Sequence, residues 1–434
     1  MISNKKNIFE FTPSVLWFFF MAIPFVIQAL CLDLYQFKSE IIIVLSVGII
    51  LFLADFFCYD KNVTNQTSSN LKKSFFADFY SFIAFFPLII HLFVETDIPI
   101  ITKFFHNPDF STAELAVMRD FSSKLLDIPL IFKYLNNWLI VIFCPLSIYY
   151  LFSTQRKLIA FFCFIFLSFY AVHTLAKFPL IEIIGSSFFL FLFSRRIFYT
   201  KILFFLKKVS PYIFVLCMYF LYHEETHKQF SLNESYFDSL YSVFDADDPR
   251  MYFTLADKYR SNYLYAEHKI NFSYFIYRGF LTPSDVSIRW YQYFSLKDNK
   301  HLGFVNFLPF SRNPNSKPNA EIIGDWAYKK RFPNRYLYNV SANSSFDADA
   351  FSRFGFVGVF IVSILIFIIR IGSALLVKNN PLSILFYSII VFMLSFFPCI
   401  ASTQAILGAH GLFLPILIMI YLRFKNSSTV RQSI

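Results

Sequence analysis

The chain has 434 residues, of which 56% are hydrophobic and only 15% are charged. Apolar stretches long enough to cross a bilayer would have no shelter from water in a soluble protein, so this composition excludes an ordinary soluble globular protein. The formal net charge of +11 would suit nucleic-acid binding, so the distribution of the charges has to decide that question.

Hydropathy places membrane helices of roughly 20 residues along most of the chain. The predicted spans are 13–32, 41–58, 75–96, 130–152, 158–176, 178–198, 205–222, 353–374, 381–399 and 402–422. We therefore predict an all-α polytopic membrane protein of about ten transmembrane helices, with one large, mainly helical or irregular loop between the seventh and the eighth. The expected regions are 1–222 with the first seven helices, 223–352 with the loop, and 353–434 with the last three helices and a short tail.

Lys and Arg concentrate beside alternate loops, and this pattern sets the orientation. With a cytoplasmic N-terminus, the basic residues at 72–73, 156–157 and 195–196 all lie in the cytoplasm, and the short loops on the opposite side carry few. Both termini are then cytoplasmic and the 223–352 loop lies outside, where acidic residues nearly balance its basic ones. The positive charge is a topology signal, and nucleic-acid binding is not expected.

The N-terminal segments carry two further signals. The first apolar run is long, contains Pro24 and lacks a small-x-small cleavage site, so we expect an uncleaved helix. The outside loop near 97–129 has apolar residues at helical spacing over 112–127, which predicts an amphipathic helix on the outer membrane face. That helix is either a plain interfacial helix or a lid over a lipid substrate.

Three carboxylates lie in or near the apolar spans, where ionisable residues are functional candidates. Asp55 and Asp78 are expected near the inner interface, which weakens a functional interpretation. Glu182, close to the outer face, either reaches an outer site or pairs with Lys177.

The six cysteines all fall in or beside membrane spans, and none lies in the large loop. They are Cys31, Cys58, Cys144, Cys163, Cys217 and Cys399. A disulfide framework therefore does not hold the loop together.

A possible zinc motif occurs where the seventh helix leaves the membrane. Residues 223–227 read His-Glu-Glu-Thr-His, which matches the H-E-x-x-H spacing of two zinc ligands and a general base. A metalloprotease site also needs a third ligand and a shielded cavity, which the sequence does not indicate. Charged residues at a helix exit explain the string more simply, so we expect no metal.

The large loop is rich in tyrosine and arginine. Between Tyr236 and Tyr338 it holds half of the chain's 26 tyrosines. Tyrosine rings stack on sugars and their hydroxyls hydrogen-bond to them, while the guanidinium fork of arginine suits phosphate oxygens. The same two residue types also enrich ordinary membrane interfaces. Composition alone leaves both interpretations open.

Four segments follow one another toward the C-terminal end of this loop: RGFLTP (278–283), YQYF (291–294), PFSRNPNSKPNAEIIG (309–324) and NSSFDADAFSRFGFVG (343–358), the last opening a helix. In this order they resemble the bacterial oligosaccharide repeat-unit polymerases of the Wzy type, which make O-antigen and capsule. Those proteins are many-helix membrane proteins with a large periplasmic loop, and the resemblance covers about a fifth of the chain in motif detail.

Individual residues match or depart from the family pattern. Arg278 is a single arginine where the pattern has a basic pair, so that role is carried over to Arg278 alone. Asn343, Asp349 and Gly355 match the pattern before the late helix, whereas Asp347 replaces an apolar residue.

The resemblance implies a glycosyltransferase that works without metal or cofactor at the periplasmic face of the bacterial inner membrane. It would move a glycan from undecaprenyl pyrophosphate onto an incoming lipid-linked repeat unit. Its partners would be undecaprenyl-pyrophosphate-linked glycans, membrane lipids, a chain-length regulator and a flippase.

That reaction needs a group that stabilises the departing pyrophosphate and a group that deprotonates or orients the accepting sugar hydroxyl. Arg278 is expected to do the first and Asp349 the second. The residues expected to bind pyrophosphate or sugar are Arg260, Arg289, Arg353, Tyr291, Tyr293 and Asn343.

Other interpretations stay open. Ser344 or Ser345 followed by Asp347 and Asp349 also reads as an N-cap with an acidic first helical turn. A ligase would use the same chemistry. A flippase or other transporter needs polar residues along facing helices, whereas the polar residues here concentrate in one outer loop. The histidines at 268, 301 and 410 show no partner in sequence and are more often structural than catalytic.

Overall fold

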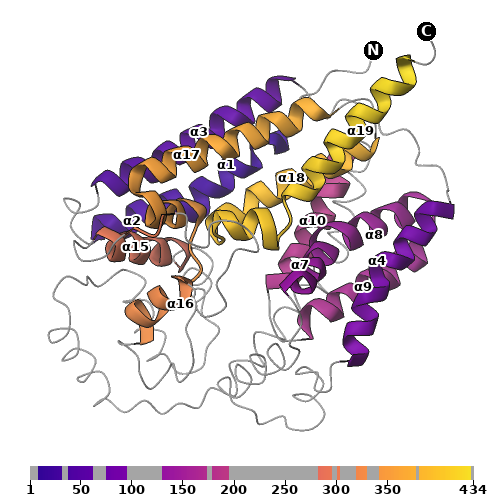
Figure 1. Ribbon diagram of the computed structural model, residues 1–434, viewed down its shortest axis with the longest axis horizontal. Coiled ribbons are helices and arrows are strands. Elements are labelled where there is room, and N and C mark those ends of the chain that lie inside the picture. Colours follow the sequence, from indigo (N-terminus) through magenta and orange to yellow (C-terminus); the bar gives the residue numbers. More distant parts are fainter. Residues whose placement is uncertain are drawn as a thin grey trace.

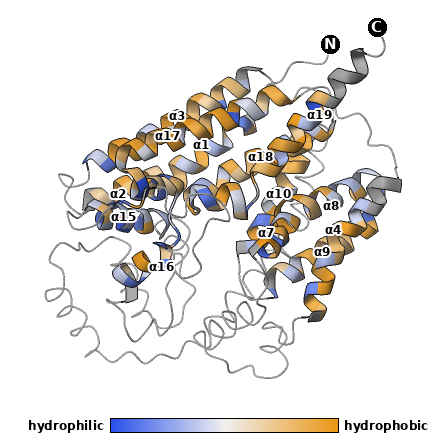
Figure 2. Ribbon diagram, in the orientation of Figure 1, coloured by the Kyte–Doolittle hydropathy of each residue, from blue (hydrophilic) through white to orange (hydrophobic). Residues whose placement is uncertain are grey.

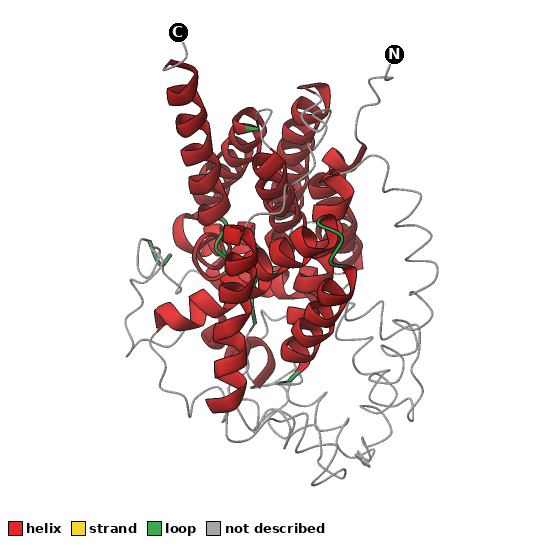
Figure 3. Ribbon diagram, turned by 90° about the vertical axis from the view of Figure 1, so that its right-hand side faces the viewer, coloured by secondary structure: helices red, strands yellow, loops and turns green. Residues whose placement is uncertain are grey.

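The computed structural model describes residues 8–31, 38–61, 75–94, 130–173, 178–194, 282–295, 301–303, 319–329, 342–377 and 381–431. Every regular element among these residues is a helix, and no strand occurs in them (Figure 3). The predicted all-helical fold is confirmed for this part of the chain.

Five helical stretches among the described residues are long and apolar enough to cross a membrane. They are Phe9–Ala29, Lys38–Tyr59, Ile131–Ser153, Phe346–Leu376 and Leu382–Cys399. Shorter apolar helices accompany them at Tyr80–Phe93, Lys157–Ala171, Pro179–Phe193 and Phe413–Phe424. Figure 2 shows hydrophobic residues along the length of these helices. The protein is therefore a helical membrane protein.

A first group of helices holds the N-terminal span together with α3 (Lys38–Lys61) and α17 (Phe346–Leu376). The N-terminal span consists of η1 (Ile8–Phe11), α1 (Thr12–Trp17), η2 (Phe18–Ala22) and α2 (Ile23–Cys31). α3 and α17 lie side by side, with α1 against α3 (Figure 1). The indole of Trp17 donates a hydrogen bond to the carbonyl of Val44 at 3.1 Å, which ties α1 to α3.

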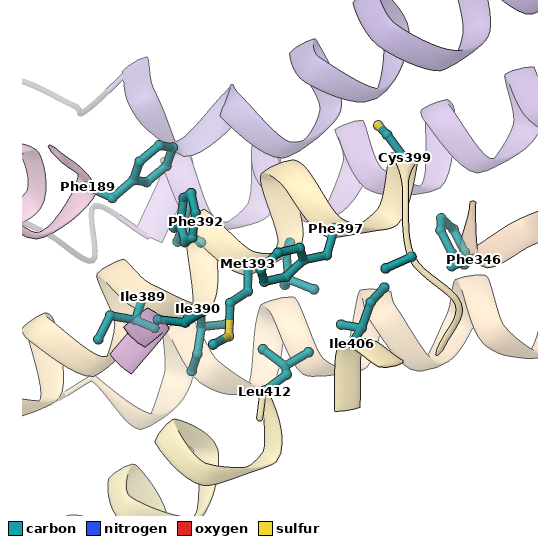
Figure 4. Packing of buried hydrophobic residues seen from close by; sticks show 14 of the residues in the cluster. Phe189, Phe346, Ile389, Ile390, Phe392, Met393, Phe397, Cys399, Ile406 and Leu412 are labelled. Carbon is teal, nitrogen blue, oxygen red and sulfur yellow. The ribbon is translucent and has the colours of Figure 1, made fainter. Parts of the chain in front are cut away.

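A second group lies on the other side of α18 (Pro381–Phe396), as Figure 1 shows. It comprises α4 (Phe75–Val94), α7 (Leu130–Trp138), η5 (Leu139–Phe143), α8 (Cys144–Ser153), α9 (Lys157–Val172) and α10 (Phe178–Ser194). α18 contacts both α10 and α1 and so joins the two groups. Figure 4 shows this interface, where Phe189 of α10 packs against Phe392 of α18. The centroids of the two rings are 5.6 Å apart.

The first group has two ends, which we call the α15 end and the Arg370 end. At the α15 end, α15 (Thr282–Ser295) packs against α2, η2 and the first turns of α17, and α16 (Asn319–Gly324) with η7 (Asp325–Lys329) follows beside α15. At the Arg370 end, α19 (Phe413–Arg431) lies against the last turns of α17. The contact includes a hydrogen bond of 2.6 Å that the side chain of Arg423 donates to the carbonyl of Leu375.

The first group also presents apolar side chains outward, as expected of helices that face lipid. On α3 these include Ile42, Ile49 and Phe52, and on α17 Phe360 and Ile361, all exposed. Hydrophilic residues gather instead on α15 (Figure 2). Apolar side chains thus cover the outward faces of α3 and α17, whereas hydrophilic side chains gather on α15.

Two helices depart from regular geometry. α17 is interrupted at Phe354 and Gly355, which divide a short first part from the long apolar second part. α18 ends at Phe396 and is followed by η8 (Phe397–Cys399), irregular residues, η9 (Ala405–Ala409) and only then α19. Both departures lie toward the α15 end of α17, where the candidate site is found.

Most predicted spans have a helix at their position, with two corrections. α17 begins at Phe346 and not at 353, because the polar residues before 353 are buried and helical. α19 begins at Phe413 and not at 402, because an irregular segment precedes it. The predicted span 205–222, the amphipathic segment 112–127 and most of the 223–352 loop lie outside the described residues.

Candidate functional site

α15 is a polar helix that is nevertheless almost completely buried. Pro283 and Asp285 occupy its first turn, where a proline costs no hydrogen bond and a carboxylate favours the helix dipole. Asp285 and Arg289 have no measurable exposure. Such burial is costly unless each polar group finds a partner, so the helix requires specific polar contacts.

Arg289 is held within α15 by two side chains. Its Nε lies 3.5 Å from Oδ1 of Asp285, one helical turn earlier, and its Nη1 donates to Oε1 of Gln292 at 3.1 Å. The arginine predicted to support phosphate binding is therefore buried in an ion pair. A pyrophosphate would have to approach an Asp–Arg pair and not an isolated guanidinium.

A second set of contacts joins α15 to the start of α17. The hydroxyl of Tyr291 donates to Oδ2 of Asp347 at 2.8 Å, and the hydroxyls of Ser287 and Ser345 lie 2.8 Å apart. Ser345 also donates to Asp347. Burial, with the charge of Asp347 adding to it, raises the pKa of Tyr291 well above its usual range. Tyr291 therefore stays protonated and remains a hydrogen-bond donor.

The first part of α17 carries its own ion pair. Nε of Arg353 lies 3.3 Å from Oδ1 of Asp349, and both side chains are buried. The backbone of Thr403, from the segment after α18, also faces Asp349. We call Asp285, Arg289, Tyr291, Asp347, Asp349 and Arg353 together the α15–α17 polar cluster.

The expected helix-cap arrangement is found only in part. Ser345 occupies the N-cap position of α17, with φ −65° and ψ 162°, but its side chain makes no capping hydrogen bond. Its hydroxyl is used by Asp347 and Ser287 instead. The serine therefore joins two helices in addition to starting one.

The interruption of α17 follows directly after Arg353. Gly355 has φ 62° and ψ −149°, a conformation that is essentially limited to glycine. The break leaves two carbonyls without their usual helical partners, and the N–H groups of Leu302 and Gly303 bond to the carbonyls of Ser352 and Arg353 at 3.0 Å each. Residues 301–303 thus close the short helix that carries Asp349 and Arg353.

The other predicted binding residues lie at the edge of the cluster or outside the described residues. Tyr293 is half-buried and packs on Trp326 at 5.2 Å between ring centroids. Asn343 is exposed. Arg278 and Arg260 lie outside the described residues, as does the His-Glu-Glu-Thr-His string. The structure thus brings Tyr291 against the N-terminal part of α17, whereas Tyr293 and Asn343 are not buried in the cluster.

Three buried polar atoms near the cluster form no hydrogen bond with any described residue. They are Oγ of Ser344, Nε2 of Gln292 and Oγ1 of Thr403, and each side chain is more than nine-tenths buried. A buried polar atom left unpaired costs about 1–3 kcal/mol. Such atoms are candidates for contact with the hydroxyls of a ligand.

Sequence reasoning missed several contacts at this end. Asp285 holds Arg289, and Gln28 of α2 donates to the hydroxyl of Ser284 at 2.5 Å. Glu182, for which Lys177 was one expected partner, has His410 Nδ1 3.1 Å from its Oε1. The spacing of Asp285 and Arg289, one turn apart, was the only available signal, since the other contacts join distant segments.

Sequence reasoning also missed a buried charge network at the Arg370 end. Arg370 contacts Oε2 of Glu10 at 2.6 Å and Oδ1 of Asp55 at 3.0 Å, and Tyr387 donates to the same Glu10 oxygen at 2.6 Å. Asp55, expected near the inner interface, is fully buried among the helices of the Arg370 end. Buried charged side chains therefore occur at the Arg370 end as well as at the α15 end.

No group of three or more potential metal ligands converges among the described residues. Comparisons with protein-family models, curated proteins and solved structures gave no match for this chain.

Proposed function

We propose that the protein is a membrane glycosyltransferase that polymerises undecaprenyl-pyrophosphate-linked repeat units into O-antigen or capsular polysaccharide. One observation supports this proposal above the others. Two buried aspartate–arginine pairs, Asp285–Arg289 and Asp349–Arg353, lie on neighbouring helices at one end of a bundle of apolar helices. That arrangement suits a substrate with an apolar tail, an anionic linker and a polar head.

The residues divide between the two tasks of glycosyl transfer. Arg278, with Arg260, Arg289 and Arg353, stabilises the pyrophosphate as it departs, since guanidinium groups match its oxygens in pairs. Asp349 orients the accepting hydroxyl. Tyr291, Tyr293 and Asn343 bind the sugars, together with the unpaired atoms of Ser344, Gln292 and Thr403.

The cellular arrangement is part of the same proposal. About ten helices cross the bacterial inner membrane, both termini are cytoplasmic, and the α15 end faces the periplasm. Nucleotide sugars are absent there, so a transferase on that side needs a lipid-linked donor. A flippase would deliver the repeat units and a chain-length regulator would limit their number.

Buried charges at both the α15 end and the Arg370 end raise the alternative that the protein is a transporter. A transport path needs polar groups along its length. Between the α15–α17 polar cluster and Arg370, the buried face of α17 is formed by Val359, Val362 and Ile366, with Ser363 bonded to its own helix. Along α17, the two polar regions are therefore separated by an apolar stretch, which favours the transferase.

The proposal is tested with lipid-linked glycans extracted from cells that lack the protein. Wild-type protein in proteoliposomes should elongate this extract into a ladder of repeats, detected after mild acid release and fluorescent labelling. Arg278→Ala and Arg289→Ala should each lower the rate at least 10-fold. Arg423→Ala, an exposed arginine at the opposite end, is the matched control and should leave the rate within 2-fold.

Each contrary outcome has a definite meaning. An intact ladder with both arginine variants would overturn the site assignment. If cells that lack the protein accumulate completed lipid-linked polymer and not single repeats, and also contain acceptor without glycan, the protein is a ligase. No elongation by the wild-type protein would overturn the polymerase.

A further inference from the structure

The segment between α18 and α19 is the most irregular part of the described bundle. The 16 residues of α18 are about 24 Å long at about 1.5 Å per residue, and together with η8 they form the membrane-crossing stretch Leu382–Cys399. Residues 397–412 then turn back through η8 and η9 before α19 begins. Irregular backbone at this depth is tolerated only where protein buries it or where it lines a polar cavity.

The segment is firmly held on the side of the second group. The indole of Trp138 donates to the carbonyl of Gly408 at 2.8 Å. Gly411 has φ 75°, and a Cβ atom at this position would lie 2.5 Å from the Trp138 ring. Only glycine therefore fits at residue 411, and the turn that presents His410 is fixed by its surroundings.

The same segment also reaches the α15–α17 polar cluster. Thr403 faces Asp349 through its backbone, and its buried Oγ1 forms no hydrogen bond with any described residue. η8, which ends at Cys399, contacts α17, whose first residue Phe346 lies on the same side of the close-up as Cys399 (Figure 4). One short stretch of chain therefore joins Asp349 to the turn that carries His410.

His410 combines the features expected of a proton acceptor. Its Nδ1 lies 3.1 Å from Oε1 of Glu182, and its ring stacks on Phe397 with 3.8 Å between the centroids. The His410 side chain is 15% exposed, whereas that of Glu182 is 7% exposed. The pair thus has a buried carboxylate behind an imidazole that remains accessible.

We propose that the Glu182–His410 pair is the general base of the transferase, with His410 as a catalytic residue and Glu182 as a positioning residue. This inference rests on the proposed function. Nε2 of His410 takes the proton of the accepting sugar hydroxyl while the hydroxyl oxygen bonds to the anomeric carbon of the donor. The bond from that carbon to the phosphate oxygen breaks, and its electron pair leaves with undecaprenyl pyrophosphate.

Glu182 stabilises the imidazolium formed in this step, which afterwards releases its proton to water. This assigns the proton to His410 and leaves Asp349, already engaged by Arg353, to orient the hydroxyl.

The other described histidines are engaged in different ways. Nδ1 of His301 lies 3.3 Å from the carbonyl of Ser352, at the closed end of the short helix. His91 contacts the hydroxyl of Tyr170 at 3.1 Å, and His173 bonds to the backbone of Tyr170. These contacts are with backbone carbonyls and a tyrosine hydroxyl, whereas the contact of His410 is with a carboxylate.

The test measures elongation of the extracted lipid-linked glycans by purified variants in proteoliposomes. His410→Gln should lower kcat about 100-fold, the lower range for loss of a general base, with KM within 3-fold. His91→Gln is the matched control, a half-buried histidine with a tyrosine partner, and should keep kcat within 3-fold. Glu182→Gln should lower kcat about 10-fold, and Glu182→Asp should restore part of the loss.

A rescue experiment separates chemistry from folding. Added imidazole should raise the rate of His410→Gly at least 5-fold and leave the wild-type rate unchanged, an effect that a structural role would not produce. If His410→Gln retains wild-type kcat, or if imidazole does not rescue His410→Gly, the assignment is wrong while the polymerase stands. If the wild-type protein itself does not elongate the extract, the proposed function fails with it.

Discussion

At the residue scale, Gly355 separates the short polar first part of α17 from its long apolar second part. Sequence comparison with the polymerase pattern marked this glycine without giving a reason for it. The reason is conformational, because φ 62° with ψ −149° strains any residue that has a Cβ atom. His301 and the N–H groups of Leu302 and Gly303 are placed by the same break.

A paired substitution tests this role of Gly355. Gly355→Ala should destabilise the protein by about 1–3 kcal/mol, the usual cost of such strain. Gly372→Ala, in the regular part of the same helix with nothing within 4 Å of the added methyl group, should be neutral or stabilising by up to about 1 kcal/mol. Thermal unfolding in detergent, followed by loss of the monodisperse peak, compares the two. Equal midpoints would contradict the strain argument.

At the element scale, four helical elements meet at the Arg370 end through one buried network. Arg370 on α17 binds Glu10 and Asp55, which precede it by 360 and 315 residues. Cys58 of α3 lies 3.8 Å from the carbonyl of Arg370 and extends the same contact. Hydropathy cannot reveal such a network, because an arginine near the end of an apolar run looks like an ordinary interfacial charge.

Removing the arginine should leave two buried carboxylates without a compensating positive charge. Arg370→Met should destabilise the protein by about 3–5 kcal/mol, since Glu10 and Asp55 then lose their cationic partner. Arg423→Met, at the same end but exposed, should change stability by less than about 1 kcal/mol. Detergent thermal unfolding again provides the readout. A further variant, Arg370→Met with Glu10→Gln and Asp55→Asn, should recover much of the loss, and failure to recover would point to packing in place of charge.

At the scale of the whole molecule, the sequence predicted the helical class and the positions of most helices, because bilayer thickness imposes a length on each apolar run. It did not predict that α15 is buried, because a polar helix at a membrane surface is normally expected to face water. It also missed the interruption at 397–412, since apolar residues such as Phe397 and Ile406 give the same hydropathy whether or not they belong to a continuous α-helix. The pairing of Glu182 with His410 depends on the path of that segment, so hydropathy could not predict it either.

The predicted orientation has its own test. In a variant without native cysteines, Ser295→Cys at the end of α15 should react with a membrane-impermeant maleimide in intact spheroplasts. Gln155→Cys, in the exposed turn between α8 and α9, should react only after permeabilisation. The reverse pattern would invert the topology, and labelling of both in intact cells would place both turns on one side.

The position of the interruption in α17 also predicts how deep its polar residues lie in the membrane. At about 1.5 Å per residue, the helix beyond Gly355 is about 30 Å long, which equals the usual hydrocarbon thickness. We therefore expect Arg353 and Asp349 to lie at the level of the lipid head groups, where the acyl chains end. A prenyl-linked substrate would meet them with its tail still dissolved among the lipids, so the membrane itself would set the height at which its phosphates are presented.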